Sequence, residues 1–164
     1  MSDAIRVGLV GFGYASKTFH APLIGGTPGM ALKAVASSDA DKVHADWPGV
    51  KVMSAPGDLL DDPDIDLVVI ATPNDTHFPL AKAALEAGKH VVVDKPFIRD
   101  TVTSSRAGKP GEALRSDTSV FHNRRWDSDF LTVSALINEG QLGEVCYFES
   151  HFDRFRPQVA PALA

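Results

Sequence analysis

Short, predominantly apolar runs recur along the first 121 residues and predict the strands of a sheet. The runs Ile5–Val10, Ile65–Ala71 and His90–Val93 have the composition expected of parallel strands that are covered on both faces. Further strands are predicted at 31–36, 50–53 and 118–121. Because helical segments and turn residues separate these runs, their order predicts βαβ units and an α/β fold with a parallel sheet.

Two helices are expected between these strands from apolar spacing and end signals. One begins at about Ala15, and Pro22 is expected to end or kink it because proline lacks the N–H of a helix interior. The other, over about 76–87, is the clearest helix of the sequence. Asp75 or Thr76 can cap its start, and Gly88 can end it.

The pattern of polarity changes near residue 122. A helix predicted over 128–139 is followed by 144–152, where polarity alternates as in a strand with one face in solvent. Since this strand type differs from the buried strands before it, we expect a domain boundary here. The chain would then consist of a first domain, 1–121, and the truncated start of a second α/β domain, 122–164.

Length, charge and cysteine content limit the possible functions. The 164 residues are enough for one domain with its own core, and the net charge of −5 argues against a general binder of nucleic acid or anionic membranes. The sequence lacks a run of about 18 apolar residues, as a membrane span requires, and its N-terminus lacks a signal-peptide pattern. The single cysteine, Cys146, lies among apolar residues and is expected to be buried. We therefore expect a cytoplasmic protein without nucleic-acid or membrane partners.

A glycine-rich turn follows the first strand and opens the first helix, with the sequence Gly11-Phe12-Gly13-Tyr14-Ala15-Ser16. Glycines here allow a tight turn and the close approach of a pyrophosphate, which binds the helix N-terminus. Ser16 replaces the third glycine of the dinucleotide fingerprint and is still small. So short a motif also arises by chance or as a structural turn, but its place at the first βα turn favours nucleotide binding.

The second strand ends on Ser37 and Ser38, where an acid would bind the adenosine ribose of NAD. Two hydroxyls, with Lys42 following, suit the 2′-phosphate of NADP, so NADP is preferred over NAD. The alternative is a solvent-exposed polar turn.

Polar residues also follow the fourth and fifth strands, where ligands of open α/β sheets bind. Thr72 and Asn74 are candidate cofactor contacts, whereas His77 alone is most often a hydrogen-bonded structural histidine. After the fifth strand comes Asp94-Lys95-Pro96. A lysine beside a cationic nicotinamide can accept the proton of a substrate hydroxyl, and the alternative is a salt bridge between Lys95 and Asp94.

A last polar cluster, 122–127, follows the sixth predicted strand. Asn123 and Arg124 would reach the same cleft, or else belong to a surface cluster at a helix start. The six histidines show no metal-ligand spacing, so no metal site is expected.

Three stretches occur in order along the chain: GFGYASKTFHAPLI, ATPNDTHFPLAKAALEAGKHVVVDKPF and SVFHNRRWDSDF. Together they resemble the glucose–fructose oxidoreductase/inositol dehydrogenase family, the Gfo/Idh/MocA oxidoreductases. The resemblance implies a Rossmann-type doubly wound domain that binds NAD or NADP, followed by a second α/β domain. It also implies hydride transfer to or from a sugar, a polyol or a related small molecule.

The resemblance also assigns roles to single residues. It implies that Lys95 is catalytic, in substrate binding and proton transfer, and that Asp94 stands where relatives have the glutamate that approaches the nicotinamide ribose. The bond before Pro96 is often cis in relatives. The expected cofactor-binding residues are Gly11, Phe12, Gly13, Tyr14, Ala15, Ser37, Ser38, Thr72, Pro73, Asn74, His77, Asp94, Lys95, Asn123 and Arg124.

Two departures from the family leave two functions open. The family's second domain, with its catalytic histidine, has no counterpart, and the segment IRDTVTSSRAGKPGEALRSDT lacks the amphipathic pattern of a crossover helix. We hypothesise that reading-frame shifts or an aberrant gene end produced this segment and the tail QVAPALA, which sequencing of the genomic locus would test. The chain is then an NAD(P)-dependent oxidoreductase or a truncated, inactive dinucleotide-binding module. A homo-oligomer is expected, because a cut domain leaves apolar surface and an unpaired strand edge.

Overall fold

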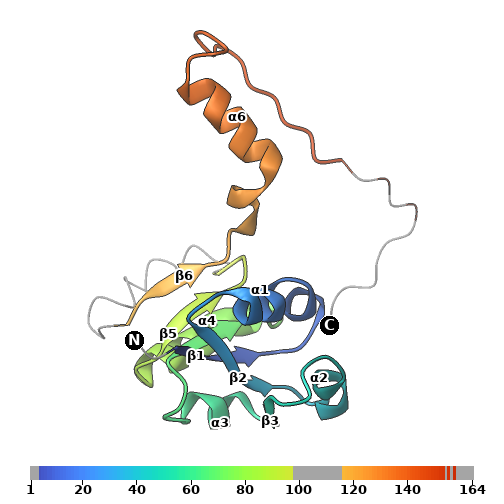
Figure 1. Ribbon diagram of the computed structural model, residues 1–164, viewed down its shortest axis with the longest axis vertical. Helices are drawn as coiled ribbons and strands as arrows, with labels where there is room; N and C mark the ends of the chain where they lie inside the picture. Colours follow the sequence, from blue (N-terminus) through green and yellow to red (C-terminus); the bar gives the residue numbers. More distant parts are fainter. Residues whose placement is uncertain (1–3, 98–115, 154, 156, 158–164) are drawn as a thin grey trace. The chain divides into compact units, whose positions relative to one another are not determined.

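The computed structural model describes residues 4–97, 116–153, 155 and 157. The chain divides into two compact units, 1–121 and 122–164. The elements of the first unit (Figure 1) are β1 (Ile5–Val10), η1 (Ser16–His20), α1 (Ala21–Gly26), β2 (Met30–Ala36), α2 (Ala40–Asp46), β3 (Lys51–Met53), α3 (Pro56–Leu60), β4 (Leu67–Ile70), α4 (Asn74–Glu86), β5 (His90–Val93) and β6 (Thr118–Val120). Those of the second unit are η2 (Asn123–Trp126) and α6 (Ser128–Asn138).

The six strands of the first unit form one sheet in the order β3-β2-β1-β4-β5-β6, and every neighbouring pair is parallel. From β1 the chain moves outward to β3, and then returns to the other side of β1 with β4. This is the doubly wound order, whose switch point lies between β1 and β4. The predicted Rossmann-type α/β fold is therefore confirmed.

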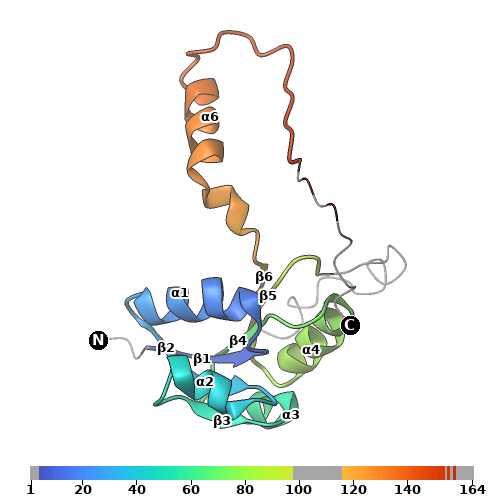
Figure 2. The ribbon, with the colours of Figure 1, turned by 90° about the vertical axis from the view of Figure 1, so that its right-hand side faces the viewer.

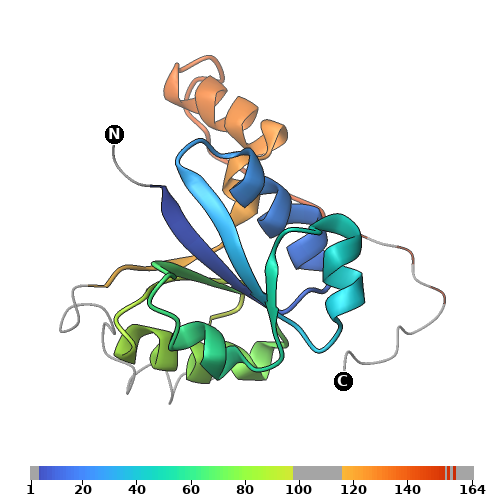
Figure 3. The same ribbon diagram turned by 60° about the horizontal axis from the view of Figure 1, so that its bottom comes forward.

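Helices cover both faces of this sheet, and each face has its own apolar core. Figure 2 shows α1 and α4 on opposite sides of the strands, and Figure 3 shows α2 beside α1 and α3 beside α4. Alternate residues of one strand serve the two cores: Val7 and Leu9 pack with α1 and α2, whereas Val10 packs with α3 and α4. Such two-sided burial explains why the strands are apolar along most of their length.

Two short helices of the first unit were not expected from the sequence. In α2, Asp39 is the N-cap, and its Oδ1 accepts a hydrogen bond from the Lys42 backbone N–H at 3.0 Å. In α3, Pro56 occupies the first turn and Leu59 is fully buried. Both helices are too short to show a clear apolar periodicity.

The first long helix does not end at Pro22, because the helical run continues over 14–26. Its turn from Ser16 to His20 is π-helical, and the Ala21 N–H donates to the Ser16 carbonyl five residues back. The wider turn precedes the proline, whose ring would crowd a normal α-helical carbonyl.

The expected caps of α4 were also wrong. The helix begins at Asn74, directly after Pro73, and no side chain caps it. Its end was predicted correctly, because Gly88 follows it with a φ of +75°.

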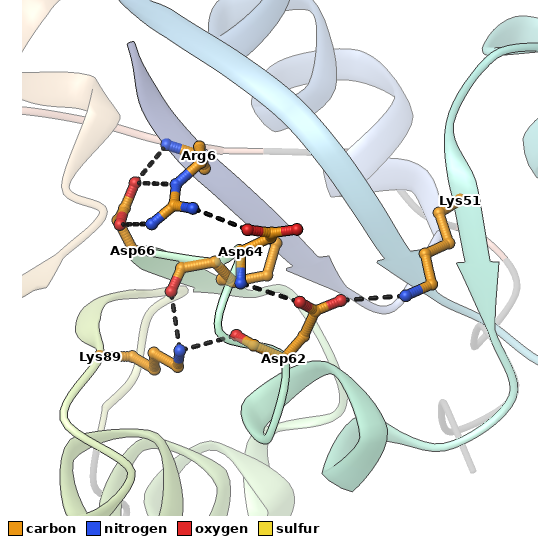
Figure 4. A network of polar contacts seen from close by, with 7 residues as sticks. Arg6, Lys51, Asp62, Asp64, Asp66 and Lys89 are labelled. Carbon is orange, nitrogen blue, oxygen red and sulfur yellow. Dashed lines mark hydrogen bonds and ion pairs between the residues drawn. The ribbon is translucent and has the colours of Figure 1, made fainter. Parts of the chain in front are cut away.

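A charged network joins the amino-terminal ends of β1 and β4 (Figure 4). The Arg6 guanidinium donates to both carboxylate oxygens of Asp66, at 2.9 and 2.6 Å, and the Arg6 backbone N–H donates to the same group at 2.8 Å. These hydrogen bonds from the side chain and the backbone of Arg6 lower the pKa of Asp66 to about 2. Lys89 Nζ donates to the carbonyls of Asp62 and Ile65, each at 2.8 Å. The network ties the strand ends together at one edge of the sheet.

The second unit holds the predicted helix but not the predicted strand. The helix α6 follows Asp127 and is followed by Gly140, whose φ is +70°. The expected strand at 144–152 was wrong, since no residue there is in a strand. A strand needs a partner for its backbone groups, and the described residues of this unit provide none. Cys146 is exposed rather than buried, for the same reason.

Within the described ranges, no helix is long and apolar enough to cross a membrane. The same ranges contain no group of three or more metal-ligating side chains that could hold an ion. The unusual segment that follows the lysine motif lies almost wholly within 98–115, which is outside the described residues. The tail from 158 onward is also outside them.

Candidate functional site

The carboxyl ends of the strands of the first unit lie along one edge of the sheet. Backbone hydrogen bonds extend the ladder by one residue beyond each strand and so align the loops that follow. These bonds are Gly11 N–H to Ala36 O (2.9 Å), Ser37 N–H to Met53 O (2.9 Å), Ala71 N–H to Val10 O (3.0 Å), Asp94 N–H to Ile70 O (2.9 Å) and Phe121 N–H to Val93 O (2.8 Å). The predicted residues after β1, β2, β4 and β5 are thereby brought to a common edge.

Gly11 begins the turn after β1 in a conformation that requires glycine. Its φ is +88°, and a Cβ at this position would lie 2.8 Å from the Ala71 carbonyl oxygen. The hydroxyl of Ser16, which is fully buried, donates to the Gly11 carbonyl at 2.8 Å. The serine that replaces the third glycine of the fingerprint therefore fixes the turn through its side chain.

Gly13 meets a different environment, because a Cβ there would have no atom within 4 Å. The helix begins at this point, with the Lys17 N–H donating to the Gly13 carbonyl at 3.0 Å. The N–H groups of the first turn, at Tyr14, Ala15 and Ser16, precede that bond and have no acceptor one helical turn earlier. Open space before a helix N-terminus fits an anionic group such as a pyrophosphate.

The side chains of this turn do not all lie at the site. Phe12 is 5% exposed and belongs to the core beneath α1, so only its backbone can approach a ligand. Tyr14 is 78% exposed and stacks edge-on against Phe19. Ala15 is half-buried.

The loop after β2 presents hydroxyls and a lysine. Ser37 Oγ accepts from the Asp39 N–H at 3.2 Å, so this hydroxyl partly serves the local turn. Ser38 and Lys42 are both exposed. Asp39 caps α2 and is thereby occupied by its own helix.

The loop after β4 is closed by two threonines. Thr76 Oγ1 donates to the Pro73 carbonyl at 2.6 Å, and Thr72 Oγ1 lies 2.6 Å from Thr76 Oγ1. Because the hydroxyl hydrogen of Thr76 is already used, Thr72 is the donor in the second bond. Asn74 opens α4 and is exposed.

His77 joins the loop after β4 to the lysine motif. The ring is 1% exposed, its Nε2 lies 2.8 Å from the Thr72 carbonyl oxygen, and its Nδ1 lies 2.8 Å from the Pro96 carbonyl oxygen. Since both ring nitrogens contact the backbone, the geometry favours the structural alternative for His77 over a direct cofactor contact.

The lysine motif follows β5, and its Lys95–Pro96 peptide bond is cis. Lys95 is exposed. The side chain of Asp94 forms a hydrogen bond with His20 rather than a salt bridge with Lys95, and His20 Nε2 lies 3.1 Å from Asp94 Oδ1. Sequence reasoning missed His20, although it lies in the first of the three quoted stretches, because nothing local to the helix reveals its contact with β5.

The remaining candidates, Asn123 and Arg124, belong to η2 in the second unit. Asn123 is half-buried, and Arg124 forms an ion pair with Asp127 at 2.7 Å. The site built by the first unit therefore consists of the loops after β1, β2, β4 and β5.

Residues 5–117 match the oxidoreductase family with an NAD-binding Rossmann fold that is termed GFO_IDH_MocA. The chain belongs to the Gfo/Idh/MocA oxidoreductase family. The resemblance stated from the sequence motifs is thereby confirmed. The match covers β1 to β5 and thus includes every loop of the site.

Relatives agree with this assignment. An uncharacterized oxidoreductase of Escherichia coli, YdgJ, is 70% identical over 162 residues, which cover 97% of this chain and 46% of the relative. The Bacillus subtilis scyllo-inositol 2-dehydrogenase (NADP(+)) IolW is 34% identical over 157 residues, 96% of this chain and 44% of IolW. A solved structure from Yersinia pestis, 61% identical, superposes with a TM-score of 0.93 over 100% of this chain and 47% of its own. The chain spans about half the length of these relatives.

Proposed function

We propose that the first unit binds NADP, in preference to NAD, for a hydride transfer to or from a sugar, a polyol or a related small molecule. The observation that carries the proposal is the Gly11–Ser16 turn, which opens a helix N-terminus at the switch point of the sheet. Family membership supports the same cofactor class. The name of the relative IolW supports NADP and a cyclic polyol.

The loops after β1, β2 and β5 have distinct roles in this proposal. The first-turn N–H groups after Gly13 bind the pyrophosphate, and Ser38 and Lys42 contact the 2′-phosphate. Asp94 accepts hydrogen bonds from the nicotinamide ribose. The nicotinamide, when bound, supplies or accepts the hydride.

Lys95 would handle the proton that accompanies the hydride. Its ammonium group is exposed beyond the end of β5, where a substrate hydroxyl can be bound. In the oxidation of an alcohol, neutral Lys95 Nζ takes the hydroxyl proton. In the reverse reaction, the charged ammonium returns it to the carbonyl oxygen.

The proposal is tested by measuring NADPH binding by fluorescence and NADP reduction with a panel of inositols and sugars. Lys95→Ala is expected to leave the cofactor dissociation constant within about threefold and to lower kcat by about 100-fold or more. Lys82→Ala is the matched control, because it removes an exposed lysine from α4, where the ammonium pairs with Glu86. A purified, folded chain that binds neither NADPH nor NADH would overturn the proposal.

The preference between the two cofactors has a separate test. Lys42→Ala should raise the dissociation constant of NADPH by about tenfold and that of NADH by less than about twofold, because only NADPH carries the 2′-phosphate. Equal losses for both cofactors would contradict the assignment of Lys42.

A second candidate function is dinucleotide binding without turnover. The observation in its favour is that the second unit has no buried hydrophobic residue among its described positions, and so no packed core to support a substrate pocket. Tight NADPH binding with no turnover across the whole panel would support this function. Any turnover that Lys95→Ala abolishes would exclude it.

A further inference from the structure

We propose that His20 is a positioning residue, which holds Asp94 in the orientation that the nicotinamide ribose requires. The proposal rests on the cofactor binding proposed above. His20 lies on η1 and is 3% exposed, and its Nε2 is 3.1 Å from Asp94 Oδ1 across a separation of 74 residues. Because a carboxylate oxygen only accepts, His20 Nε2–H is the donor.

The π-helical turn explains how His20 reaches the sheet. Ser16 and His20 stand at its two ends and are both buried. Ser16 donates to the carbonyl of Gly11, and His20 donates to the carboxylate of Asp94. A single helical turn thus fixes the proposed pyrophosphate turn at one end and the lysine motif at the other. Wider turns of this kind are frequent at functional sites.

Phe121 fixes the plane of the His20 ring. The two ring centroids are 4.3 Å apart with an interplanar angle of 48°. Phe121 is itself placed beside β5, because its backbone N–H donates to the Val93 carbonyl at 2.8 Å. His20 is therefore held by packing on one side while its Nε2–H is directed at Asp94.

The contact leaves Asp94 able to accept further hydrogen bonds. A carboxylate has about four acceptor positions, and His20 uses one of them. The side chain of Asp94 remains 20% exposed, so the group reaches the edge of the site while His20 holds it from within. Without His20, the carboxylate is free to pair with the adjacent Lys95, which would withdraw both groups from their proposed roles.

The test separates positioning from general folding by using two ligands. NADPH carries the nicotinamide ribose, whereas adenosine 2′,5′-bisphosphate carries only the adenosine end. His20→Leu removes the donor and keeps an apolar side chain; His20→Gln keeps a side-chain N–H. We expect His20→Leu to weaken NADPH about tenfold and the bisphosphate less than about twofold, with His20→Gln within about threefold of the wild type for both.

Coupling to Asp94 gives an independent readout. In the Asp94→Ala background, which has no side-chain acceptor at this position, His20→Leu should cause little further loss of NADPH affinity, because both variants remove the same contact. Equal weakening of the two ligands by His20→Leu, or unchanged NADPH binding, would overturn the proposal. A wild-type chain that binds the bisphosphate but not NADPH would refute the proposed function itself, and this inference with it.

If His20→Leu does not fold, nuclear magnetic resonance of the wild type carries the test. A slowly exchanging Nε2–H signal of His20 that is lost in Asp94→Ala supports the contact. Absence of that signal, or its persistence in Asp94→Ala, overturns it.

Discussion

The two units of the chain differ in what surrounds their apolar side chains. Every buried hydrophobic residue that the structure describes lies between Val7 and Val93, in the two cores of the first unit. In the second unit, the large apolar residues of α6 are between 37% and 51% exposed: Phe130, Leu136 and Ile137 are examples. Both units contain apolar sequence, but among the described residues only those of the first unit form layers on both sides of a sheet that bury it.

This difference indicates that the first unit carries both the proposed chemistry and the packed core. The loops of the site are anchored to strands that are packed on both faces, so their positions follow from the core. The helix α6 has clear local signals, but an isolated helix of 11 residues is marginal in water. Its apolar residues are therefore left partly exposed, whereas the described residues of the first unit bury theirs in two cores.

The largest expected effect compares one buried and one exposed leucine. Leu59 is fully buried against β1, where a Cβ on Gly8 would lie 2.6 Å from its Cδ2, and Leu136 is 37% exposed. Leu59→Ala should lower the free energy of unfolding by about 2–5 kcal/mol, and Leu136→Ala by less than about 1 kcal/mol.

The measurement is urea unfolding followed by tryptophan fluorescence in a Trp126→Phe background. Trp126 is 78% exposed in the second unit, whereas Trp47 packs against a core of the first unit, so the remaining signal reports the first unit. Equal losses for the two leucine variants would contradict the distinction between the units.

The next effect separates stability from binding within the proposed pyrophosphate turn. Gly11→Ala should destabilise the first unit by about 1–3 kcal/mol, because φ is +88° and the added Cβ would meet the Ala71 carbonyl oxygen at 2.8 Å. Gly13→Ala should change stability by less than about 1 kcal/mol, since its Cβ would meet no atom within 4 Å.

Binding should show a different order, because the open space at Gly13 is where the pyrophosphate is proposed to lie. Gly13→Ala should weaken NADPH by about tenfold or more despite its normal stability. Thermal unfolding and NADPH titration of both variants check this pair, and a Gly13→Ala protein with unchanged affinity would remove the turn from the proposed site.

A third prediction concerns self-association through α6. Phe130, Val133 and Ile137 lie on one side of the helix at helical spacing, and Thr132 lies on the other. We expect association at about 20–50 µM that Ile137→Glu reduces and Thr132→Glu does not, because only the first places a charge among the apolar residues. Light scattering would decide, and a wild-type monomer over this range would contradict the prediction.

The comparison also shows which features a sequence reveals. Apolar runs predicted the strands of the first unit, since a strand buried on both faces needs apolar residues throughout. The turn at Gly11 was predicted because glycines directly after a strand allow a tight turn. A different pattern was misleading at 144–152, where alternating polarity indicated a strand whose neighbours do not occur among the described residues.

Contacts between segments that are distant in the chain could not be predicted from the sequence alone. His20 and Asp94 are separated by 74 residues, and neither the helix nor the strand signals the other. The sequence indicated that His77 could be a hydrogen-bonded structural histidine. It did not reveal which two carbonyl groups the ring contacts. Such pairings depend on how the helices pack against the sheet. Local sequence patterns do not specify this packing.

The smallest change in stability is expected at Asp66. It tests whether residues that stabilise the fold and residues that bind the cofactor lie at opposite ends of the strands. Asp66 is paired with Arg6 at the amino-terminal edge, and this pairing lowers its pKa from 3.8 to about 2. The ionised carboxylate thus stabilises the fold above pH 3.8, and this contribution is lost as the pH falls towards 2. Asp66→Asn should cost about 1 kcal/mol or less at pH 7, because the pair is partly solvated.

The pH dependence gives this prediction its sharpest form. The difference in unfolding free energy between the wild type and Asp66→Asn should be largest at neutral pH and shrink steadily in acid. Asp64→Asn is the matched control, since Asp64 is 81% exposed and contacts Arg6 through a single pair at 2.9 Å. Both variants should bind NADPH as the wild type does, because the proposed site lies at the carboxyl ends of the strands. A loss of NADPH affinity in Asp66→Asn would show that the two edges are coupled through the sheet.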